Sequence, residues 1–257
     1  MDVQAREGRA DRGGHGAGGG LGRLLHRRGA EAAGHAKRLF DLARRTNVAD
    51  FAWNRAVHRL RPGRKIFFIG FNKCATSSIH KLLNHQGVRS VHWHAGRANL
   101  ALEIEARLAD PERLAAFLRR WTAFSDLIYA TDDRIIEGNR HFRLFHELFP
   151  DAYFVLNDRD PETWVASRMR HKSGQFASQY AAFHHCAPEA LPPLWRGARE
   201  AHNDAVLRHF EGNPRFLHLR VDRDDMQVLL DFLAPDFRLR RNRLQWANVT
   251  GEPDRPA

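Results

Sequence analysis

Short apolar runs alternate along the chain with longer segments in which apolar residues recur every three or four positions. The run at residues 66–71 (IFFIGF) is continuously apolar, as expected for a parallel strand that is buried on both faces. Runs of this kind predict strands at residues 66–71, 87–93, 126–131, 152–157 and 215–221. Helical spacing predicts helices at residues 98–121, interrupted at Asp110-Pro111, and at 140–149, 161–171, 193–210 and 225–234. This alternation predicts a three-layer α/β domain with helices on both faces of a central parallel sheet.

The segments outside this core differ from it in composition. Residues 1–22 are rich in Gly, Arg and Asp and have almost no large apolar residues, which predicts a disordered basic tail. Residues 23–62 combine leucines and aromatic residues with many arginines, and they predict one or two amphipathic helices that end at Pro62-Gly63. The core domain is therefore placed at residues 63–245, with a flexible tail at 246–257.

Charge and cysteine content narrow the class of protein. The 257 residues include 41 Lys and Arg against 30 Asp and Glu, and the net charge of +11 favours nucleic acid, anionic lipid, or phosphorylated or sulfated small molecules as partners. A nucleic-acid-binding protein would interleave basic and aromatic residues on one element, and the basic first 60 residues show no clear case. The two cysteines, Cys74 and Cys186, form no disulfide framework or zinc motif, which favours a reducing, cytoplasmic location. No apolar run reaches the ~18 residues of a membrane span, and no secretory signal is expected.

The loop after the first strand has the composition of an anion-binding cradle. Residues 65–83 read KIFFIGFNKCATSSIHKLL, so a polar loop joins an apolar strand to an amphipathic helix. A strand–loop–helix unit presents backbone N–H groups and the positive end of a helix to an anion. To these groups Lys73 adds an ammonium, and Thr76, Ser77 and Ser78 add hydroxyls. The composition predicts a phosphate-binding loop.

This loop differs from the P-loop of nucleotide triphosphatases, G-x-x-x-x-G-K-[ST]. Counted from Gly70, Ala75 and Thr76 stand where that pattern needs a second glycine and a lysine. Lys73 comes three positions early, and no lysine precedes the hydroxyl that would hold Mg²⁺. The loop is therefore not built for Mg²⁺-dependent γ-phosphoryl transfer, although a P-loop kinase or NTPase is the main rival among enzymes.

The segment Lys73-Cys74-Ala75-Thr76-Ser77-Ser78-Ile79 resembles the K-x-G-T-[TS]-x-L loop of sulfotransferases. In that family the loop binds the 5′-phosphosulfate of 3′-phosphoadenylyl sulfate (PAPS). The chain departs from the pattern at Ala75, where the family generally has glycine. A methyl group at this position is expected to require a negative φ. The departure keeps open a catalytically inactive, nucleotide-binding relative.

A second segment, residues 153–171, resembles the family's 3′-phosphate motif. That motif is a strand ending in Arg, a short loop, and a helix carrying Ser eight positions later, which Arg159 and Ser167 reproduce. A guanidinium at the end of a strand presents a planar fork to a phosphate, and Ser167 can face the same place from two turns into the helix. Arg-Asp-Pro followed by Trp164 is the form common in bacterial members. Residues 215–236 add a weaker likeness to the family's late strand, turn and helix.

The resemblance implies a P-loop-like sulfotransferase fold and transfer of a sulfuryl group from PAPS to a hydroxyl or amine. It implies that Lys73 meets the charge on the bridging oxygen of the leaving nucleotide, assisted by Thr76, Ser77 and Ser78. No metal is required by this scheme, and no metal-ligand cluster stands out. The expected partners are the sulfonucleotide and a hydroxylated acceptor: a glycan, a lipid-linked glycan or a small metabolite.

The family also implies a general base near the end of a strand between the two motifs. Ser125-Asp126-Leu127 resembles the base segment that reads Thr-His-Leu in many members, and Asp126 is the favoured base. The alternatives are Asp132, Asp133, His92 and His94.

Two further groups of residues are candidates for the site. His92 and His94 flank Trp93 at the end of a predicted strand, where alternation would place both imidazoles on one face. Late basic residues close over the 3′-phosphate in the family, and three arginines of the basic segment 237–250 stand at that place. These are Arg240, Arg241 and Arg243.

Overall fold

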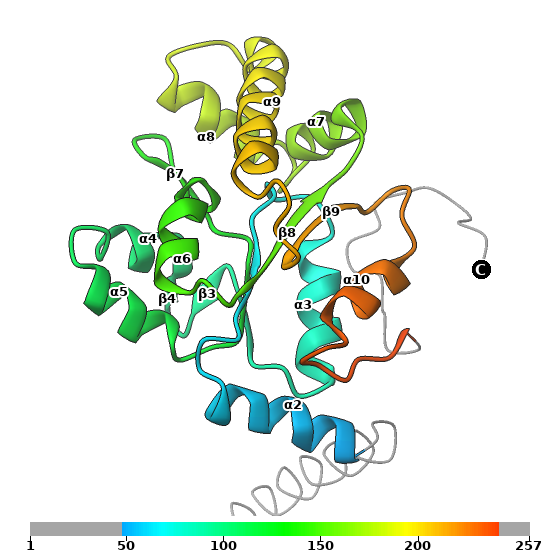
Figure 1. Ribbon diagram of the computed structural model, residues 1–257. Helices are drawn as coiled ribbons and strands as arrows, with labels where there is room; N and C mark the ends of the chain where they lie inside the picture. The colour runs from blue at the N-terminus through cyan, green and yellow to red at the C-terminus, as the bar shows by residue number, and fades with distance from the viewer. Residues whose placement is uncertain (1–47, 242–257) are drawn as a thin grey trace, which may run out of the picture. The chain divides into compact units, whose positions relative to one another are not determined.

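The computed structural model describes residues 48–241, which form a mixed α/β fold around one large sheet (Figure 1). This sheet has seven strands in the order β4-β3-β2-β5-β1-β8-β9, and the five from β2 to β9 are parallel. The strands are β1 (Ile66–Phe68), β2 (Ser90–His92), β3 (His94–Ala95), β4 (Ala98–Asn99), β5 (Ala123–Ser125), β8 (Tyr153–Asp158) and β9 (Phe216–Arg220). The predicted α/β class with a central parallel sheet is confirmed. The antiparallel β3 and β4, which extend one edge, were not predicted.

The third predicted strand, at residues 126–131, is present in part as β6 (Ile128–Ala130), but it does not belong to the parallel sheet. The parallel strand at this place is β5, whose Ala123 and Phe124 are fully buried. Asp126 then adopts a left-handed backbone with φ 59°, which turns the chain out of the sheet. Residues beyond this turn form a separate antiparallel hairpin of β6 (Ile128–Ala130) and β7 (Ile135–Glu137). A single apolar run therefore hid a strand end and a turn.

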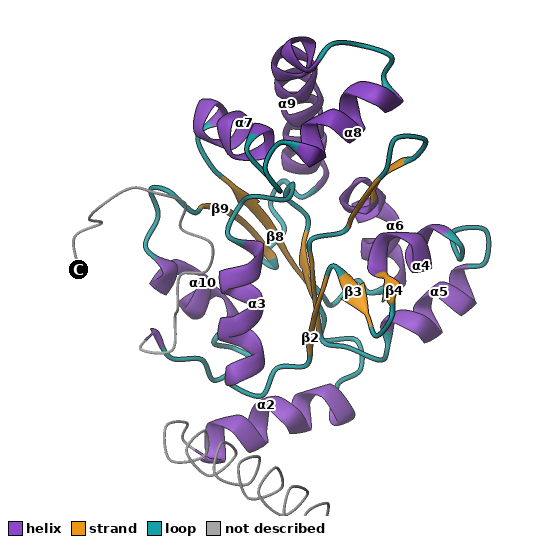
Figure 2. Cartoon of the chain, turned by 180° about the vertical axis from the view of Figure 1, so that it is seen from behind, coloured by secondary structure: helices purple, strands orange, loops and turns teal. Residues whose placement is uncertain are grey.

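Helices cover both faces of the sheet (Figures 1 and 2). Helices α2 (Val48–Leu60), α3 (Thr76–His85) and α10 (Met226–Leu233) pack on the face that receives Ile66 and Phe68. The opposite face receives Phe67, whose ring stacks on Phe124 with centroids 4.8 Å apart. The helices on that face are α4 (Leu100–Glu105), α5 (Pro111–Leu118), α6 (Phe142–Leu148) and α9 (Leu191–His209). Alternate residues of β1 thus point into two separate apolar cores.

Sequence signals for several helices hold in the structure. The break expected within residues 98–121 lies between α4 and α5, where the Asp110 carboxylate accepts a hydrogen bond from the Arg113 N–H (3.0 Å) and Pro111 begins the helix. The helices predicted at 140–149, 193–210 and 225–234 appear as α6, α9 and α10, and that at 161–171 as α7 (Pro161–Met169). Helix α8 (Gln175–Phe183) was not predicted.

Helix α2 confirms part of the amphipathic segment predicted before the core. Its Asn54 donates to the Gln86 carbonyl (2.7 Å) and accepts from the Arg238 N–H (2.9 Å), and Val57 is buried against the sheet. The predictions for residues 1–47 and 246–257 concern segments that lie outside the described residues. Within residues 48–241, no helix has the length and apolar character needed to cross a membrane.

Candidate functional site

The loop between β1 and α3 is tied to the neighbouring strand by one side chain. Asn157, at the end of β8, accepts from the Gly70 N–H at 3.0 Å and donates to the Cys74 carbonyl at 2.9 Å. Gly70 is required here because a Cβ at this position would lie 1.8 Å from the Asn157 carbonyl oxygen. Both ends of the loop are thus anchored to β8.

Other side chains engage further carbonyls of the same loop. The Trp164 indole N–H of α7 donates to the Asn72 carbonyl (3.0 Å), and His202 of α9 contacts the Ile69 carbonyl (2.8 Å). The Arg159 guanidinium donates to the Lys73 carbonyl (3.4 Å). These three loop carbonyls point toward side chains from elsewhere in the fold. They therefore do not accept hydrogen bonds from the N–H groups of the loop and do not compete with a ligand for those groups. The loop is held in shape by its surroundings.

Ala75 corrects an expectation of the sequence. Its φ is 59° and its ψ is 16°, so it occupies the left-handed region and not the negative-φ backbone expected for alanine. Lys73, two residues earlier, is also left-handed, with φ 69°. The loop adopts these conformations between the end of β1 and the start of α3, and an alanine methyl group is strained there by about 1–2 kcal/mol.

Ala75→Gly is therefore expected to raise the free energy of unfolding by about 0.5–1 kcal/mol, because relief of the left-handed strain exceeds the entropy cost of glycine. Chemical denaturation of the two proteins measures this. Ala116→Gly, at an exposed position inside α5, is the matched control and should lower the free energy of unfolding by about 1 kcal/mol. Equal destabilisation by both substitutions would contradict the strain at Ala75.

Lys73 lies among groups from three parts of the chain. Its Nζ is 3.4 Å from Nδ1 of His171, and its carbonyl is bonded by Arg159. Burial lowers the pKa of Lys73, while the nearby Asp126 carboxylate opposes that shift. The structure thus brings the Lys73 loop and Arg159 into direct contact. It also places the Asp126 carboxylate close enough to Lys73 for a charge–charge interaction between the two side chains. Ser167 is half-buried in α7, with no polar contact to Lys73 or Arg159 among the described residues.

Asp126 and His92 form a second polar group beside the loop. His92 Nε2 lies 3.6 Å from Asp126 Oδ2 and 3.2 Å from Ser77 Oγ, and its Nδ1 lies 3.1 Å from Ser125 Oγ. Burial raises the pKa of Asp126 to about 6, although Lys73 acts in the opposite direction. Burial also lowers the pKa of His92 to about 4, so its imidazole is neutral at pH 7. Asp126 Oδ1 is buried and has no hydrogen-bond partner among the described residues.

The other predicted base candidates lie elsewhere. Asp132 and Asp133 are exposed in the turn between β6 and β7, where Asp133 accepts from the Thr131 hydroxyl (2.7 Å). His94 is exposed on β3, and its ring stacks on Trp93 with centroids 4.0 Å apart. His92 and His94 do not lie on one continuous strand as predicted, because Trp93 (φ 56°) reverses the chain and the two histidines are paired across antiparallel strands.

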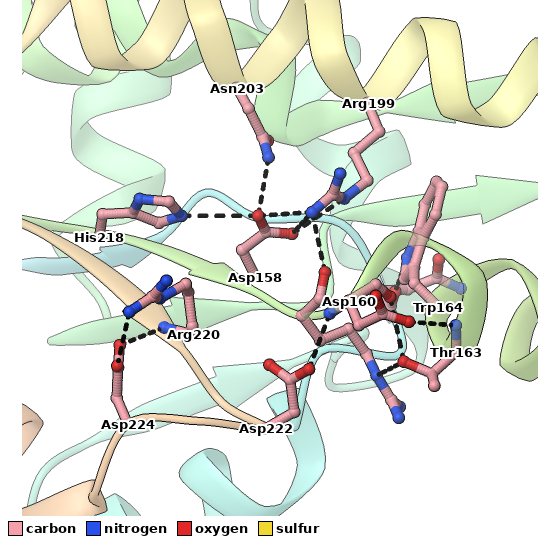
Figure 3. Close-up of polar contacts among 12 residues, drawn as sticks. Asp158, Asp160, Thr163, Trp164, Arg199, Asn203, His218, Arg220, Asp222 and Asp224 are labelled. Carbon is pink, nitrogen blue, oxygen red and sulfur yellow. Dashed lines mark hydrogen bonds and ion pairs between the residues drawn. The ribbon is translucent and has the colours of Figure 1, made fainter.

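A buried ion-pair network surrounds Asp158 at the end of β8 (Figure 3). Asp158 accepts from Arg199 Nε at 2.9 Å and from Asn203 at 2.9 Å, both on α9. Burial acts to raise the pKa of Asp158, but the His218 ring, whose Nε2 lies 3.5 Å from Oδ2, and the hydrogen bonds from Arg199 outweigh it and hold the pKa below its usual value. Arg199 also donates to the Arg159 carbonyl (2.8 Å). The main chain of Arg159 is therefore fixed.

The Arg159 side chain is not neutralised by the carboxylates around it. Asp158 is paired with Arg199, and Asp160 caps α7 through the Thr163 N–H (2.9 Å). The guanidinium contacts only the Thr163 hydroxyl (3.3 Å) and the Lys73 carbonyl within the part of the chain that the structure describes. A guanidinium without a carboxylate partner, held beside the β1–α3 loop, is able to pair with an anionic group such as a phosphate.

The sequence profile of the sulfotransferase domain family matches residues 65–224, more than half of the chain. The chain belongs to this family. The matched range contains β1 and its loop, Asp126, Arg159 and the ion-pair network of Asp158. A comparison with curated proteins finds no match.

Two of the three late arginines expected near the 3′-phosphate form ion pairs with other residues of the fold. Arg240 pairs with Asp50 of α2 at 2.8 Å, and Arg241 pairs with Asp225 at 2.9 Å. Arg243 lies outside the described residues. In residues 48–241 the sulfotransferase fold brings together no group of three or more His, Cys, Asp or Glu side chains that could hold a metal ion.

Sequence reasoning missed two residues of the sulfotransferase site. Asn157 is the polar end of an otherwise apolar strand, and that position was the available signal for its role as a loop anchor. His171 lies two residues beyond the end of α7 at Met169, so helical spacing gives no signal for it. The contact of His171 with Lys73, 98 positions away, has no local signal.

Proposed function

We propose that the chain is a PAPS-dependent sulfotransferase that transfers a sulfuryl group to a hydroxyl, or an amine, of its acceptor. The single observation that carries the proposal is the contact between the Lys73 loop and Arg159. One anion-binding loop and one carboxylate-free arginine in contact suit a nucleotide with phosphates at both the 5′ and 3′ positions. Domain limits at 63–245 and a cytoplasmic location remain predictions from the sequence.

The residues of the loop fit the sulfated end of the donor. The loop supplies the N-terminus of α3, a ten-residue helix, together with the hydroxyls of Thr76, Ser77 and Ser78. Lys73 would meet the negative charge that grows on the bridging oxygen as the sulfuryl group leaves. Cys74 and Ala75 contribute main-chain groups. Arg159, together with Ser167 of α7, would hold the 3′-phosphate.

Asp126 is proposed as the general base. Its side chain is 17% exposed, so an acceptor hydroxyl can reach the carboxylate, donate a hydrogen bond to it and pass its proton to it. A pKa of about 6 leaves the carboxylate ionised at neutral pH and raises its basicity above that of an exposed aspartate. His92 and Ser125 hold the adjoining groups in place. The acceptor class remains open among glycans, lipid-linked glycans and small hydroxylated metabolites.

Calorimetric titration tests the donor assignment. Adenosine 3′,5′-bisphosphate should bind in the micromolar range, and Arg159→Ala should weaken binding by about 1.5–3 kcal/mol because a charge-assisted hydrogen bond to the 3′-phosphate is lost. AMP, which lacks that phosphate, is the control ligand and should bind the two proteins equally. Equal affinity of the wild-type protein for AMP and the bisphosphate would refute the 3′-phosphate assignment, and preferential binding of ATP–Mg²⁺ would favour a kinase.

A further inference from the structure

His171 lies beside Lys73 and is the last residue of the segment 153–171, but it is not one of the two positions that carry the 3′-phosphate motif. It lies two residues after the end of α7, and its N–H donates to the Arg168 carbonyl (3.1 Å). Its Nδ1 is 3.4 Å from Lys73 Nζ, and its ring packs edge-on against Phe176 of α8 with centroids 5.4 Å apart. The imidazole is therefore held between the loop and α8.

We propose that His171 is a positioning residue for Lys73: its Nδ1 accepts a hydrogen bond from the ammonium and directs it toward the oxygen of the leaving group. This inference rests on the proposed function, because it assigns a task to a lysine that acts in sulfuryl transfer. A lysine side chain has four rotatable bonds, and a fixed acceptor selects among its rotamers. Ordering Lys73 before the donor arrives removes an entropy cost from the reacting state.

The charges around His171 keep it in the form that accepts. Burial, followed by the positive charges of Lys73, Lys172 and Arg168, lowers the pKa of His171 to about 4. The ring is therefore neutral at pH 7, and a proton on Nε2 leaves Nδ1 as the acceptor. A charged imidazole would repel Lys73.

The segment that carries His171 is anchored on both sides. Arg168, three residues before it, is 1% exposed and lies within 5.5 Å of the centroids of five aromatic rings. Lys172, directly after it, places its Nζ 4.6 Å from the centroid of the Trp93 ring, across the site on the β2–β3 turn. These two contacts fix the backbone on either side of the imidazole. The position of the Nδ1 acceptor is thus set by the fold.

Two substitutions separate a positioning role from a structural one. His171→Phe keeps an aromatic ring for Phe176 but removes the acceptor, whereas His171→Asn keeps an acceptor near the place of Nδ1 but removes the ring. We expect His171→Phe to lower the rate of transfer by about 10-fold with little change in bisphosphate affinity, and His171→Asn to recover most of that loss. The same substitution at the exposed His184, at the end of α8, is the control and should leave the rate unchanged.

The rate is measured as single-turnover release of adenosine 3′,5′-bisphosphate from PAPS, with water as the acceptor that is always present. A double-mutant cycle with Lys73→Ala then tests whether His171 acts through Lys73. In the Lys73→Ala protein, His171→Phe should change the rate by less than about twofold. A full additional loss in that background would overturn the proposal, as would a His171→Asn protein slower than His171→Phe, which is the order that ring packing alone predicts.

A second readout needs no nucleotide. In protein labelled with ¹⁵N-lysine, the Lys73 ammonium, assigned by its loss in Lys73→Ala, should exchange protons with water faster in His171→Phe than in the wild type. Lys65, whose buried Nζ donates to the Trp121 carbonyl, is the internal control and should not change. Unchanged exchange at Lys73 overturns the inference. If the wild-type protein neither binds the bisphosphate nor consumes PAPS, the proposed function fails, and this readout still decides whether His171 orders Lys73.

Discussion

Asp126→Asn should abolish most of the transfer activity while making the folded protein more stable. Loss of a general base costs about 10²–10⁴-fold in rate, and asparagine cannot accept the proton of an acceptor hydroxyl. The reaction with water as acceptor reports this loss, since water also needs a base. In the wild type, the rate should fall as the pH drops through about 6, where Asp126 takes up a proton, and the Asp126→Asn protein should lack this step.

The gain in stability follows from the same pKa. Burial makes the folded-state pKa of Asp126 higher than the unfolded value of 3.8, so the folded protein binds this proton more tightly. Ionisation of Asp126 above pH 6 therefore costs about 2–3 kcal/mol of stability, a cost that is absent below pH 4. Asparagine removes the buried charge and also tolerates the left-handed φ of 59°.

Thermal unfolding at pH 7.5 and pH 4 measures the stability effect, and the advantage of Asp126→Asn should shrink at the lower pH. His92→Gln is the companion variant for the rate, because it removes the imidazole and leaves the carboxylate in place. If Asp126→Asn keeps the wild-type rate and His92→Gln loses it, Asp126 is not the base. A destabilised Asp126→Asn protein would contradict the buried charge.

Arg168→Met should destabilise the fold by about 3–5 kcal/mol, the largest structural effect that we expect from one substitution. Arg168 pairs with the Glu137 carboxylate at 2.7 Å, and their side chains are 1% and 9% exposed. Tyr180 contacts both, and burial followed by the charge of Glu137 raises its pKa well above the ordinary value, so it donates as a phenol. Methionine fills a similar volume but leaves Glu137 buried without its cation.

Chemical denaturation measures this loss. Arg113→Met removes an exposed arginine whose nearest carboxylate is 4.0 Å away, and it should change stability by less than about 0.5 kcal/mol. The double variant Arg168→Met with Glu137→Gln should recover part of the loss, because no buried charge remains. Near-equal stability of the Arg168 and Arg113 variants would show that the ring-lined ion pair does not hold β7, α7 and α8 together.

The parallel sheet and the positions of the two motifs could be predicted because they depend on local signals. Residues 66–71 are apolar without interruption, as expected for a strand buried on both faces, and β1 occupies Ile66–Phe68 of this run. Lys73 and Arg159 each follow a strand, and parallel strands present their carboxyl ends at one edge of a sheet. The pairing of β1 with β8 then brings the Lys73 loop and Arg159 together. The likeness to sulfotransferases, carried by these segments, is confirmed by the family match.

Backbone turns escaped the sequence because side-chain type constrains φ only weakly outside glycine and proline. Asp126 and Trp93 each end a strand in the left-handed region, and the apolar pattern around them continues as if the strand did not stop. Ala75 shares this conformation, although an alanine is strained by it. The surrounding contacts over-determine these backbones, and such contacts have no periodicity along the chain.

By itself, then, the sequence determined the class of fold, the places of most of its strands and helices, and the two segments that resemble the family's motifs, because hydrophobic period and motif spacing are properties of neighbouring residues. Only the tertiary structure decided what surrounds Lys73. Asn157 anchors the loop that carries Lys73, and the Arg159 guanidinium donates to the Lys73 carbonyl. His171 Nδ1 lies within hydrogen-bond distance of the Lys73 ammonium, and the Asp126 carboxylate acts on its pKa. These partners come from strands and helices far away along the chain, and their distances follow from the packing of the sheet and its helices.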